Sequence, residues 1–252
     1  IRDSWLMAMA EMDSKQRATW EAIYDKKNEE FLKNPPVGKD LLRWKYQRYV
    51  KEYCRTIRSV DEQVGRLLDY LEEKGVLDNT VIVYTSDQGF LLGEHGLYDK
   101  RFMYEESFRT PLIISCPSLV KKHSVCKELV QNIDLAPTFL SLAGVEVPKE
   151  MSGRSLLPLF KNGKAENWRN ELYYHFYDYP AVGSVRKHDG IRTKRYKLIH
   201  WYGEGSGNDE AIDFWELYDL KKDVMEVNNV YDNPKYVKVR EALTVQLEKL
   251  RK

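Results

Sequence analysis

Cysteine is scarce in this chain, and neither a long apolar run nor an excess of charge of one sign is present. The three cysteines (Cys54, Cys116 and Cys126) form no CxxC pair, which excludes a disulfide-built scaffold and a zinc ribbon. No apolar stretch reaches the roughly 18 residues that a membrane-spanning helix needs. Lys and Arg number 40 against 39 Asp and Glu, so overall charge predicts neither a nucleic acid nor an anionic membrane as partner.

What is present is typical of a globular protein with a sizeable core. The 252 residues are 42% hydrophobic and 12% aromatic, with 31% charged side chains. The chain begins at Ile1 without an initiator Met and without a signal peptide, so we expect its amino end to be cut or processed.

The order of the predicted elements is that of an α/β protein followed by a small antiparallel part. A helical pattern runs from Asp40 to a glycine stop at Gly75, and a strand at 80–85, buried on both faces, follows a tight turn. Helix, turn and strand together predict half of a doubly wound unit. A second buried strand is expected at 111–115, and Asp134 is expected to cap a short helix ending before Gly144.

From about residue 166 the pattern changes to aromatic, partly alternating strands separated by glycine- and Asp-rich turns. An amphipathic helix from about Pro234 closes the chain. We therefore predict two parts: residues 1–165 belong to the α/β domain, and residues 166–252 form an antiparallel β subdomain with a closing helix.

The strand at 80–85 is followed by Asp87-Gln88-Gly89, at the kind of position where open α/β sheets bind ligands. A carboxylate beside an amide carbonyl offers two hard oxygen ligands, which suit Ca²⁺ or Mg²⁺ better than Zn²⁺. The local pattern alone is equally compatible with an Asp that caps a turn.

The segment from Val60 to Ile114 resembles the sulfatase family, of the alkaline-phosphatase-like superfamily. The resemblance rests on "VDEQVGR", "SDQG", "GEHG", "DKR" and "RTPLI" in that order, and continues in "IDLAPTFLSLAGVEVP", "SGRSLLPLF" and "GIRTKRYKLIHW". It implies part of an alkaline-phosphatase-like doubly wound sheet and a sulfate-ester hydrolase, with sulfated carbohydrates as the favoured substrates.

The resemblance also assigns roles to single residues. It implies that Asp87 and Gln88 are ligands of a Ca²⁺ ion, with Mg²⁺ less favoured, and that Lys100 is the catalytic lysine that holds a sulfate oxygen. His95 could contact substrate or hold its loop together, and we favour the loop. In the C-terminal part, we select His188 as a substrate-binding residue from the group His175, Arg186, His188 and Arg192.

Family members use a formylglycine made from a Cys/Ser-x-Pro-x-Arg segment, and this chain contains none. Cys54 has an Arg at the right distance but Thr in place of Pro, and we interpret it as a buried structural thiol. We therefore expect this chain to be the carboxyl-terminal part of a sulfatase, inactive alone, with the formylglycine and further calcium ligands in an amino-terminal part.

Two other interpretations stay open. The chain could belong to a phosphatase or phosphodiesterase of the same superfamily, or to a non-catalytic protein that binds sulfated glycans. The family favours a periplasmic, secreted or lysosomal location.

Overall fold

The computed structural model describes residues 9–180, 184–205 and 210–252. The chain divides into two compact units, Ile1–Leu67 and Leu68–Lys252. This division lies inside a helix, and the boundary expected near residue 165 stays a prediction.

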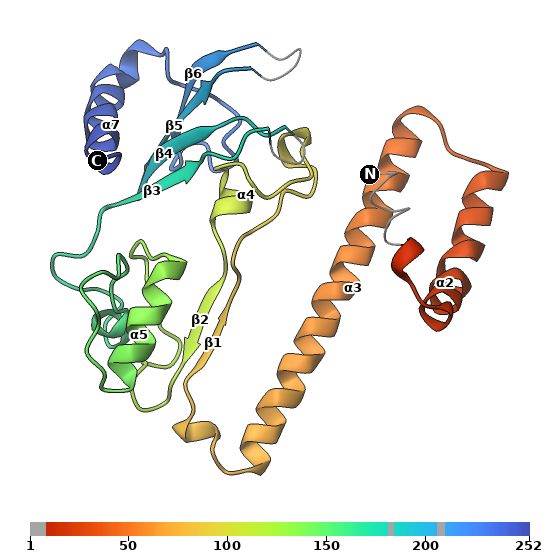
Figure 1. The fold of residues 1–252 in the computed structure, drawn as a ribbon, viewed down its shortest axis with the longest axis horizontal. Coiled ribbons are helices and arrows are strands. Elements are labelled where there is room, and N and C mark those ends of the chain that lie inside the picture. The colour runs from red at the N-terminus through yellow and green to blue at the C-terminus, as the bar shows by residue number, and fades with distance from the viewer. Residues whose placement is uncertain (1–8, 181–183, 206–209) are drawn as a thin grey trace. The chain divides into compact units, whose positions relative to one another are not determined.

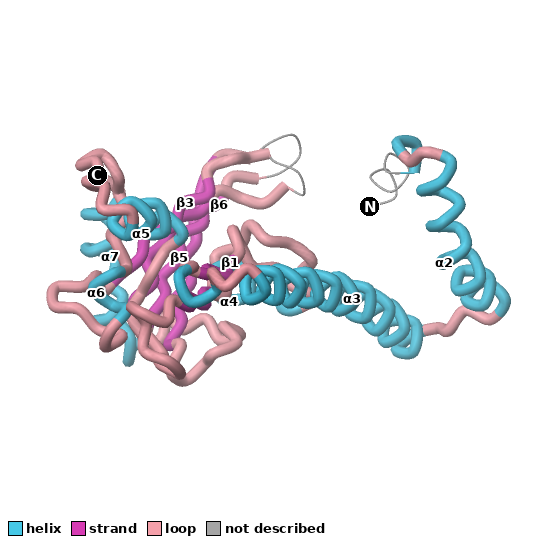
Figure 2. Tube along the Cα trace, turned by 90° about the horizontal axis from the view of Figure 1, so that it is seen from below, coloured by secondary structure: helices cyan, strands magenta, loops and turns pink. Residues whose placement is uncertain are grey.

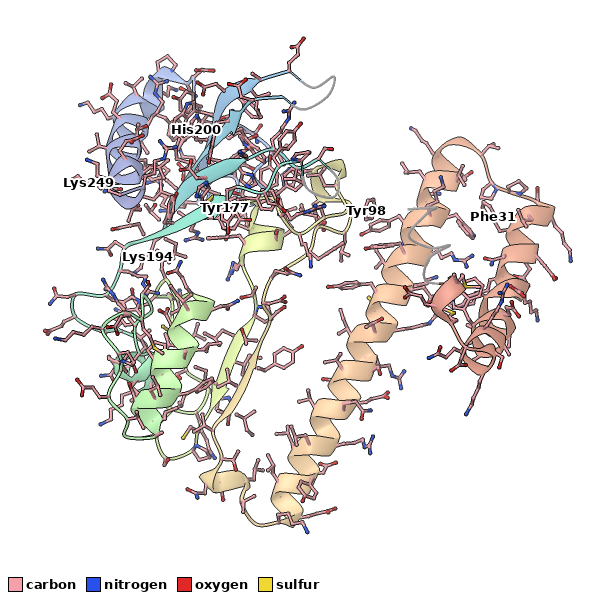
Figure 3. All side chains as sticks on the ribbon, in the orientation of Figure 1. Phe31, Tyr98, Tyr177, Lys194, His200 and Lys249 are labelled. Atoms are coloured by element: carbon pink, nitrogen blue, oxygen red, sulfur yellow. The ribbon has the colours of Figure 1, made fainter. Side chains whose placement is uncertain are left out.

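The described part of the first unit includes helix α2 (Ser14–Lys33) and most of helix α3 (Gly38–Glu73) (Figure 1). A capping box between Asp13 and Gln16 starts α2. The ring of Phe31, labelled in Figure 3, stacks on Trp44 of α3 with the ring centroids 4.1 Å apart.

Helix α3 confirms the predicted helix, and Gly75 beyond its end has the positive φ (66°) of a helix-terminating glycine. None of its residues is buried. The expectation of a buried Cys54 is therefore wrong, because this thiol lies on an exposed part of the helix. No helix in the described part of the chain is both long and apolar enough to cross a membrane.

In the second unit, strand β1 (Ile82–Thr85) pairs with strand β2 (Leu112–Ser115) in antiparallel register. The predicted strands are thus present, but the expected burial on both faces is not. Tyr84 is 40% exposed and Ile113 62% exposed, and the strand register places them opposite each other on one face of this two-stranded ribbon.

Short helices connect and flank these strands. They are η1 (Leu77–Asn79), η2 (Glu94–Gly96), α4 (Glu105–Phe108), η3 (Asn132–Asp134), α5 (Leu135–Leu142) and α6 (Leu157–Phe160). Buried Leu156, Leu159 and Phe160 form a small core to which β2 and α5 contribute partly buried residues.

Asp134 is the N-cap residue of α5, as predicted, but its side chain makes no capping hydrogen bond to that helix. Its carboxylate is fully buried and accepts hydrogen bonds from the Gln131 and Arg154 backbone N–H groups, both at 2.8 Å. The Arg169 guanidinium pairs with both carboxylate oxygens. Long-range partners outcompete the local cap because they satisfy a buried charge more completely.

The C-terminal part confirms the predicted antiparallel sheet and closing helix. The strands follow the order β3-β4-β5-β6 and form the magenta layer of Figure 2. Their bounds are β3 (Glu171–Phe176), β4 (His188–Thr193), β5 (Tyr196–Gly203) and β6 (Ile212–Asp219), with η4 (Pro234–Tyr236) and α7 (Val237–Leu250) after them.

The two faces of this sheet pack against different elements (Figure 1). Ile191, Leu198 and Leu217 face α7 and form a core with Leu243 and Leu247. On the other face, Ile199, Trp201 and Tyr218 pack against Leu91, Met103 and Tyr104 from the loop before α4. The sheet therefore lies between α7 and the loop that carries the predicted site residues.

Candidate functional site

Asp87 and Gln88 lie in the turn that follows β1. The Asp87 carboxylate is exposed, and its Oδ1 accepts a hydrogen bond from Gln88 N at 3.0 Å. Ser86 Oγ donates to Gln88 O at 2.7 Å and closes the turn. The Asp87 carboxylate thus stabilises the turn through one hydrogen bond and remains exposed to solvent, where a ligand can reach it.

Asn132, at the start of η3, holds this turn from outside. Its Nδ2 donates to the carbonyl oxygens of Ser86 and Asp87, at 3.1 and 3.0 Å. Residue Asp134, with its buried ion pair, anchors the same 3₁₀ turn. Sequence reasoning missed Asn132, and nothing in the sequence near it signalled a contact with a residue 46 positions away.

Gly89 brings the turn against the backbone of α4. Its N–H donates to Ser107 O at 2.7 Å, and a Cβ added to Gly89 would lie 1.9 Å from Glu106 O. Only glycine permits this approach of two backbone segments.

Lys100 is exposed on the loop before α4, and the backbone around it is fixed at several points. Its N–H donates to Asp99 Oδ1 at 2.6 Å, and its carbonyl accepts from the buried Ser107 hydroxyl. Asp99 in turn pairs with the Arg101 guanidinium, and Arg101 O accepts from Tyr174 Oη at 2.9 Å. Although burial opposes ionisation, hydrogen bonds from Arg101 hold the pKa of Asp99 below its usual value.

Ser107 therefore contacts both segments that the sequence selected. Its backbone carbonyl holds Gly89, directly after Gln88, and its side-chain hydroxyl holds the carbonyl of Lys100. The geometry brings the two predicted regions together through one buried serine of α4.

His95 adopts a left-handed backbone conformation (φ 54°) within η2. Its ring stacks on Tyr104 with the centroids 4.2 Å apart, and its Nε2 lies 3.8 Å from Glu106 Oε2. These contacts favour the interpretation that His95 holds the loop.

The four residues selected in the C-terminal part do not form one group. Strand register places His175 opposite Asp189 and His188 opposite Phe176, so the two histidines occupy opposite faces of the sheet. Arg192 pairs with Glu105 at 3.1 Å, and Arg186 Nη2 donates to Glu210 O at 2.8 Å.

His188 is fully buried, which differs from the exposed position that a substrate contact needs. Its ring stacks on Trp201 (4.1 Å), and its Nδ1 donates to Arg186 O at 2.8 Å. Burial lowers the pKa of His188 to about 4, so the ring is neutral at physiological pH. Its burial disfavours a direct contact with substrate, and that role stays a prediction.

The donor chemistry of the Asp87 turn fits a hard divalent cation. It offers a carboxylate and an amide oxygen on a turn that Asn132 and Ser107 hold from two sides. Within residues 9–180, 184–205 and 210–252, no cluster of three or more His, Cys, Asp or Glu side chains could hold a metal. Since Ca²⁺ takes six to eight oxygens, these two residues would supply only a part of its coordination.

Comparison with known proteins identifies the family. The family model "Sulfatase" matches residues 10–145, and the model "N-sulphoglucosamine sulphohydrolase, C-terminal" matches residues 93–252. An N-acetylglucosamine-6-O-sulfatase from Bacteroides thetaiotaomicron is 49% identical over 243 residues, which cover 96% of this chain and 42% of that protein. The multifunctional alkaline phosphatase superfamily protein PehA from Trinickia caryophylli is 35% identical over 196 residues, 73% of this chain and 36% of that protein.

A solved structure agrees with this assignment. A protein in complex with its substrate D-glucosamine-2-N,6-O-disulfate matches with a TM-score of 0.87 and 48% identity, over 96% of this chain and 48% of that chain. The present chain thus spans less than half of the length of each of these relatives. Two family models that each cover more than half of its residues show that the chain belongs to the sulfatase family.

Proposed function

We propose that this chain forms the sulfate- and cation-binding part of a sulfatase that hydrolyses sulfate esters of carbohydrates. The observation that carries the proposal is the convergence of two segments on Ser107. The oxygen-rich turn of Asp87 and Gln88 and the loop of Lys100 are both fixed to this buried serine, in a chain that belongs to the sulfatase family.

In the proposed site, Asp87 and Gln88 would hold Ca²⁺ through side-chain oxygens. A bound divalent cation would polarise the sulfate ester and offset negative charge that develops on it. Lys100 would place its ammonium beside a sulfate oxygen, where a donor fixed in advance lowers the energy of the transition state. Hydrogen bonds hold both the N–H and the carbonyl of Lys100. The backbone of Lys100 is therefore already ordered, and placing the ammonium beside the sulfate costs less conformational entropy.

The nucleophile would come from outside these 252 residues. By family resemblance it is a formylglycine, and no Cys/Ser-x-Pro-x-Arg segment occurs in the chain. We propose that residues elsewhere in the same gene product provide it, together with further calcium ligands. A periplasmic, secreted or lysosomal location accords with this assignment.

The favoured substrate is a 6-O-sulfated glucosamine. The relative that is 49% identical is an N-acetylglucosamine-6-O-sulfatase, and the matching solved structure holds a glucosamine 2-N,6-O-disulfate. Both matches cover 96% of the chain, so they include the Asp87 turn, the Lys100 loop and the C-terminal sheet.

The test is a comparison of three esters with the full gene product. N-acetylglucosamine 6-sulfate, a chromogenic phosphate monoester and a phosphonate monoester are assayed with Ca²⁺ and, separately, with Zn²⁺. We expect calcium-dependent release of sulfate from the first substrate. Preferential turnover of a phosphorus ester with Zn²⁺ would favour the phosphatase alternative, and glycan binding without turnover would favour the non-catalytic one.

Two variants then test the residue roles, each with a matched surface control. Lys100→Ala should lower kcat about 10²–10³-fold, the usual cost of one oxyanion donor, and exposed Lys122→Ala should not. Asp87→Ala should weaken Ca²⁺ binding measured by calorimetry, and exposed Asp232→Ala should leave it unchanged. Wild-type kinetics in Lys100→Ala would return Lys100 to an ordinary surface lysine.

A further inference from the structure

A lysine with no exposed surface lies between the C-terminal sheet and α4. Lys197 of β5 is 0% exposed, and its Nζ lies 2.9 Å from Glu105 Oε1 and 2.6 Å from Glu226 Oε1. Arg192 Nη2 lies 3.1 Å from the second oxygen of Glu105. Two cations thus balance two carboxylates in this group, which we call the Lys197 cluster (Lys197, Arg192, Glu105 and Glu226).

The Lys197 cluster holds α4 by both its side chain and its backbone. The Glu105 carboxylate, at the first position of α4, binds the two cations of the sheet. The second carboxylate oxygen of Glu226 accepts a hydrogen bond from Glu105 N at 2.6 Å. The Lys197 ammonium also lies 5.6 Å from the ring centroid of Phe108, at the last position of α4.

The pKa values of the two carboxylates in the cluster shift in opposite directions. Burial raises the pKa of Glu226 against the opposing effect of Lys197. Burial also acts on Glu105, but there the nearby Lys197 and Arg192 prevail and hold its pKa below the usual value. Placing an ion pair in a protein interior costs about as much in desolvation as the pair recovers, so net stability is a poor reason for it. Lys197 Nζ and Glu226 Oε1 meet at ion-pair distance without hydrogen-bond geometry, and opposite charges this close in the interior still attract strongly enough to fix the separation of the segments that carry them.

The position of α4 matters because this helix contains Ser107, which contacts both segments of the proposed site. Ser107 sits in the middle of this four-residue helix and holds Gly89 N through its carbonyl and Lys100 O through its hydroxyl. One bond starts from the Ser107 backbone and the other from its side chain, so a rotation of α4 would displace the Asp87 turn and the Lys100 loop by different amounts. The Lys197 cluster connects that helix to the four-stranded sheet by charge, beside the edge-on contact of the Phe108 and Tyr174 rings.

We infer that the Lys197 cluster is a positioning device that sets the distance between the cation-binding turn at Asp87 and the sulfate-binding Lys100. The expected effect of the cluster on catalysis rests on the proposed function, whereas its effect on the positions of the Asp87 turn and the Lys100 loop does not. Lys197, Glu105 and Glu226 are positioning residues, because they lie between the sheet and α4 and act through Ser107.

The experiment measures backbone amide exchange in the full gene product without substrate. Lys197→Met removes the ammonium and keeps an unbranched side chain of similar length. We expect amide exchange within residues 87–108 to accelerate at least tenfold, while exchange in β3–β6 changes less than threefold. Calorimetry should show Ca²⁺ binding about tenfold weaker, and kcat should fall more than KM changes, as misplaced catalytic groups predict.

Two further variants separate positioning from ordinary destabilisation. Leu247→Ala leaves a cavity on the opposite face of the same sheet, against α7. It should lower Tm and leave exchange at 87–108 and Ca²⁺ affinity unchanged. In Lys197→Met/Glu226→Gln, Arg192 still balances Glu105 and the Gln oxygen can accept from Glu105 N, so Tm should recover while kcat stays low.

The outcomes are distinguishable. If Lys197→Met fails to fold, the double variant provides the same measurements. Exchange that rises no more at 87–108 than in Leu247→Ala overturns the positioning role. If the wild-type protein hydrolyses no sulfate ester, the proposed function falls, and the exchange data still decide whether the cluster fixes the two segments.

Discussion

Gly89→Ala is the smallest change that separates the Asp87 turn from α4. An added Cβ would lie 1.9 Å from Glu106 O and 2.9 Å from Glu106 C, although real Cβ contacts are almost never below 3.0 Å. The two backbones must therefore move apart by at least 1.1 Å. Both clashing groups belong to the main chain, so no side-chain rotation can relieve the overlap, and the bond from Gly89 N to Ser107 O (2.7 Å) is lost or stretched.

The expected cost follows from the size of that shift. Forcing one extra carbon into a packed site typically destabilises a protein by about 1–3 kcal/mol. A displacement of about 1 Å at a catalytic group lowers the rate about 10²-fold. We therefore expect Gly89→Ala to lower kcat/KM for a 6-sulfated glucosamine about 100-fold and to weaken Ca²⁺ binding, with a modest loss of stability.

The control is Gly65→Ala in α3, where an added Cβ meets nothing within 4 Å. Replacing glycine by alanine inside a helix stabilises by up to about 1 kcal/mol, so this variant should match or exceed wild-type stability. Steady-state kinetics and calcium calorimetry on both variants make the comparison. Wild-type kcat/KM in Gly89→Ala would refute the reasoning that contact between the turn and α4 sets the site.

Three further predictions concern residues around the site. Asp134→Asn should destabilise the protein by about 3–5 kcal/mol in urea unfolding, because it leaves Arg169 without its buried partner; a loss below 1 kcal/mol would contradict this. Asn132→Ala should weaken Ca²⁺ binding more than it lowers Tm, because the bonds to the Asp87 turn are lost; equal Ca²⁺ affinity would argue against it. The pKa of His188, lowered from 6.5 to about 4, makes the folded state bind fewer protons than the unfolded state between these pH values, so stability should decrease as pH falls from about 6.5 to 4. The total is at most about 3.5 kcal/mol, at roughly 1.4 kcal/mol per pKa unit, and His188→Phe should lack this component in unfolding experiments across that range.

The elements of the fold follow mostly from local pattern. Helix α3 repeats apolar residues at helical spacing and stops at Gly75, and the aromatic strands after residue 166 alternate between turn residues. Both signals depend on neighbours a few positions apart, which a sequence displays directly. The site segments at 87–89 and 100 were also found from sequence, because a family resemblance preserves short motifs.

The tertiary structure decided which side chains are buried and which residues they contact. Cys54 is exposed although it lies on an amphipathic helix, and Asp134 binds Arg169 across 35 positions in place of its own helix end. Strand register sends His175 and His188 to opposite faces of one sheet. A sequence displays residue types, but register determines which face each one occupies.

The same limit explains why the connections of the site were not foreseen. Asn132 reaches the Asp87 turn across 45 positions, and Arg192 reaches Glu105 across 87. Each of these side chains looks like an ordinary polar surface residue in its own segment. The sequence by itself predicted the long helix α3, the strands and the closing helix, and its family resemblance selected the residues of the proposed site. The packing of α4 between the sheet and the Asp87 turn decided which side chains hold the segments of the proposed site in place. Contacts between distant segments form only when the whole chain has folded.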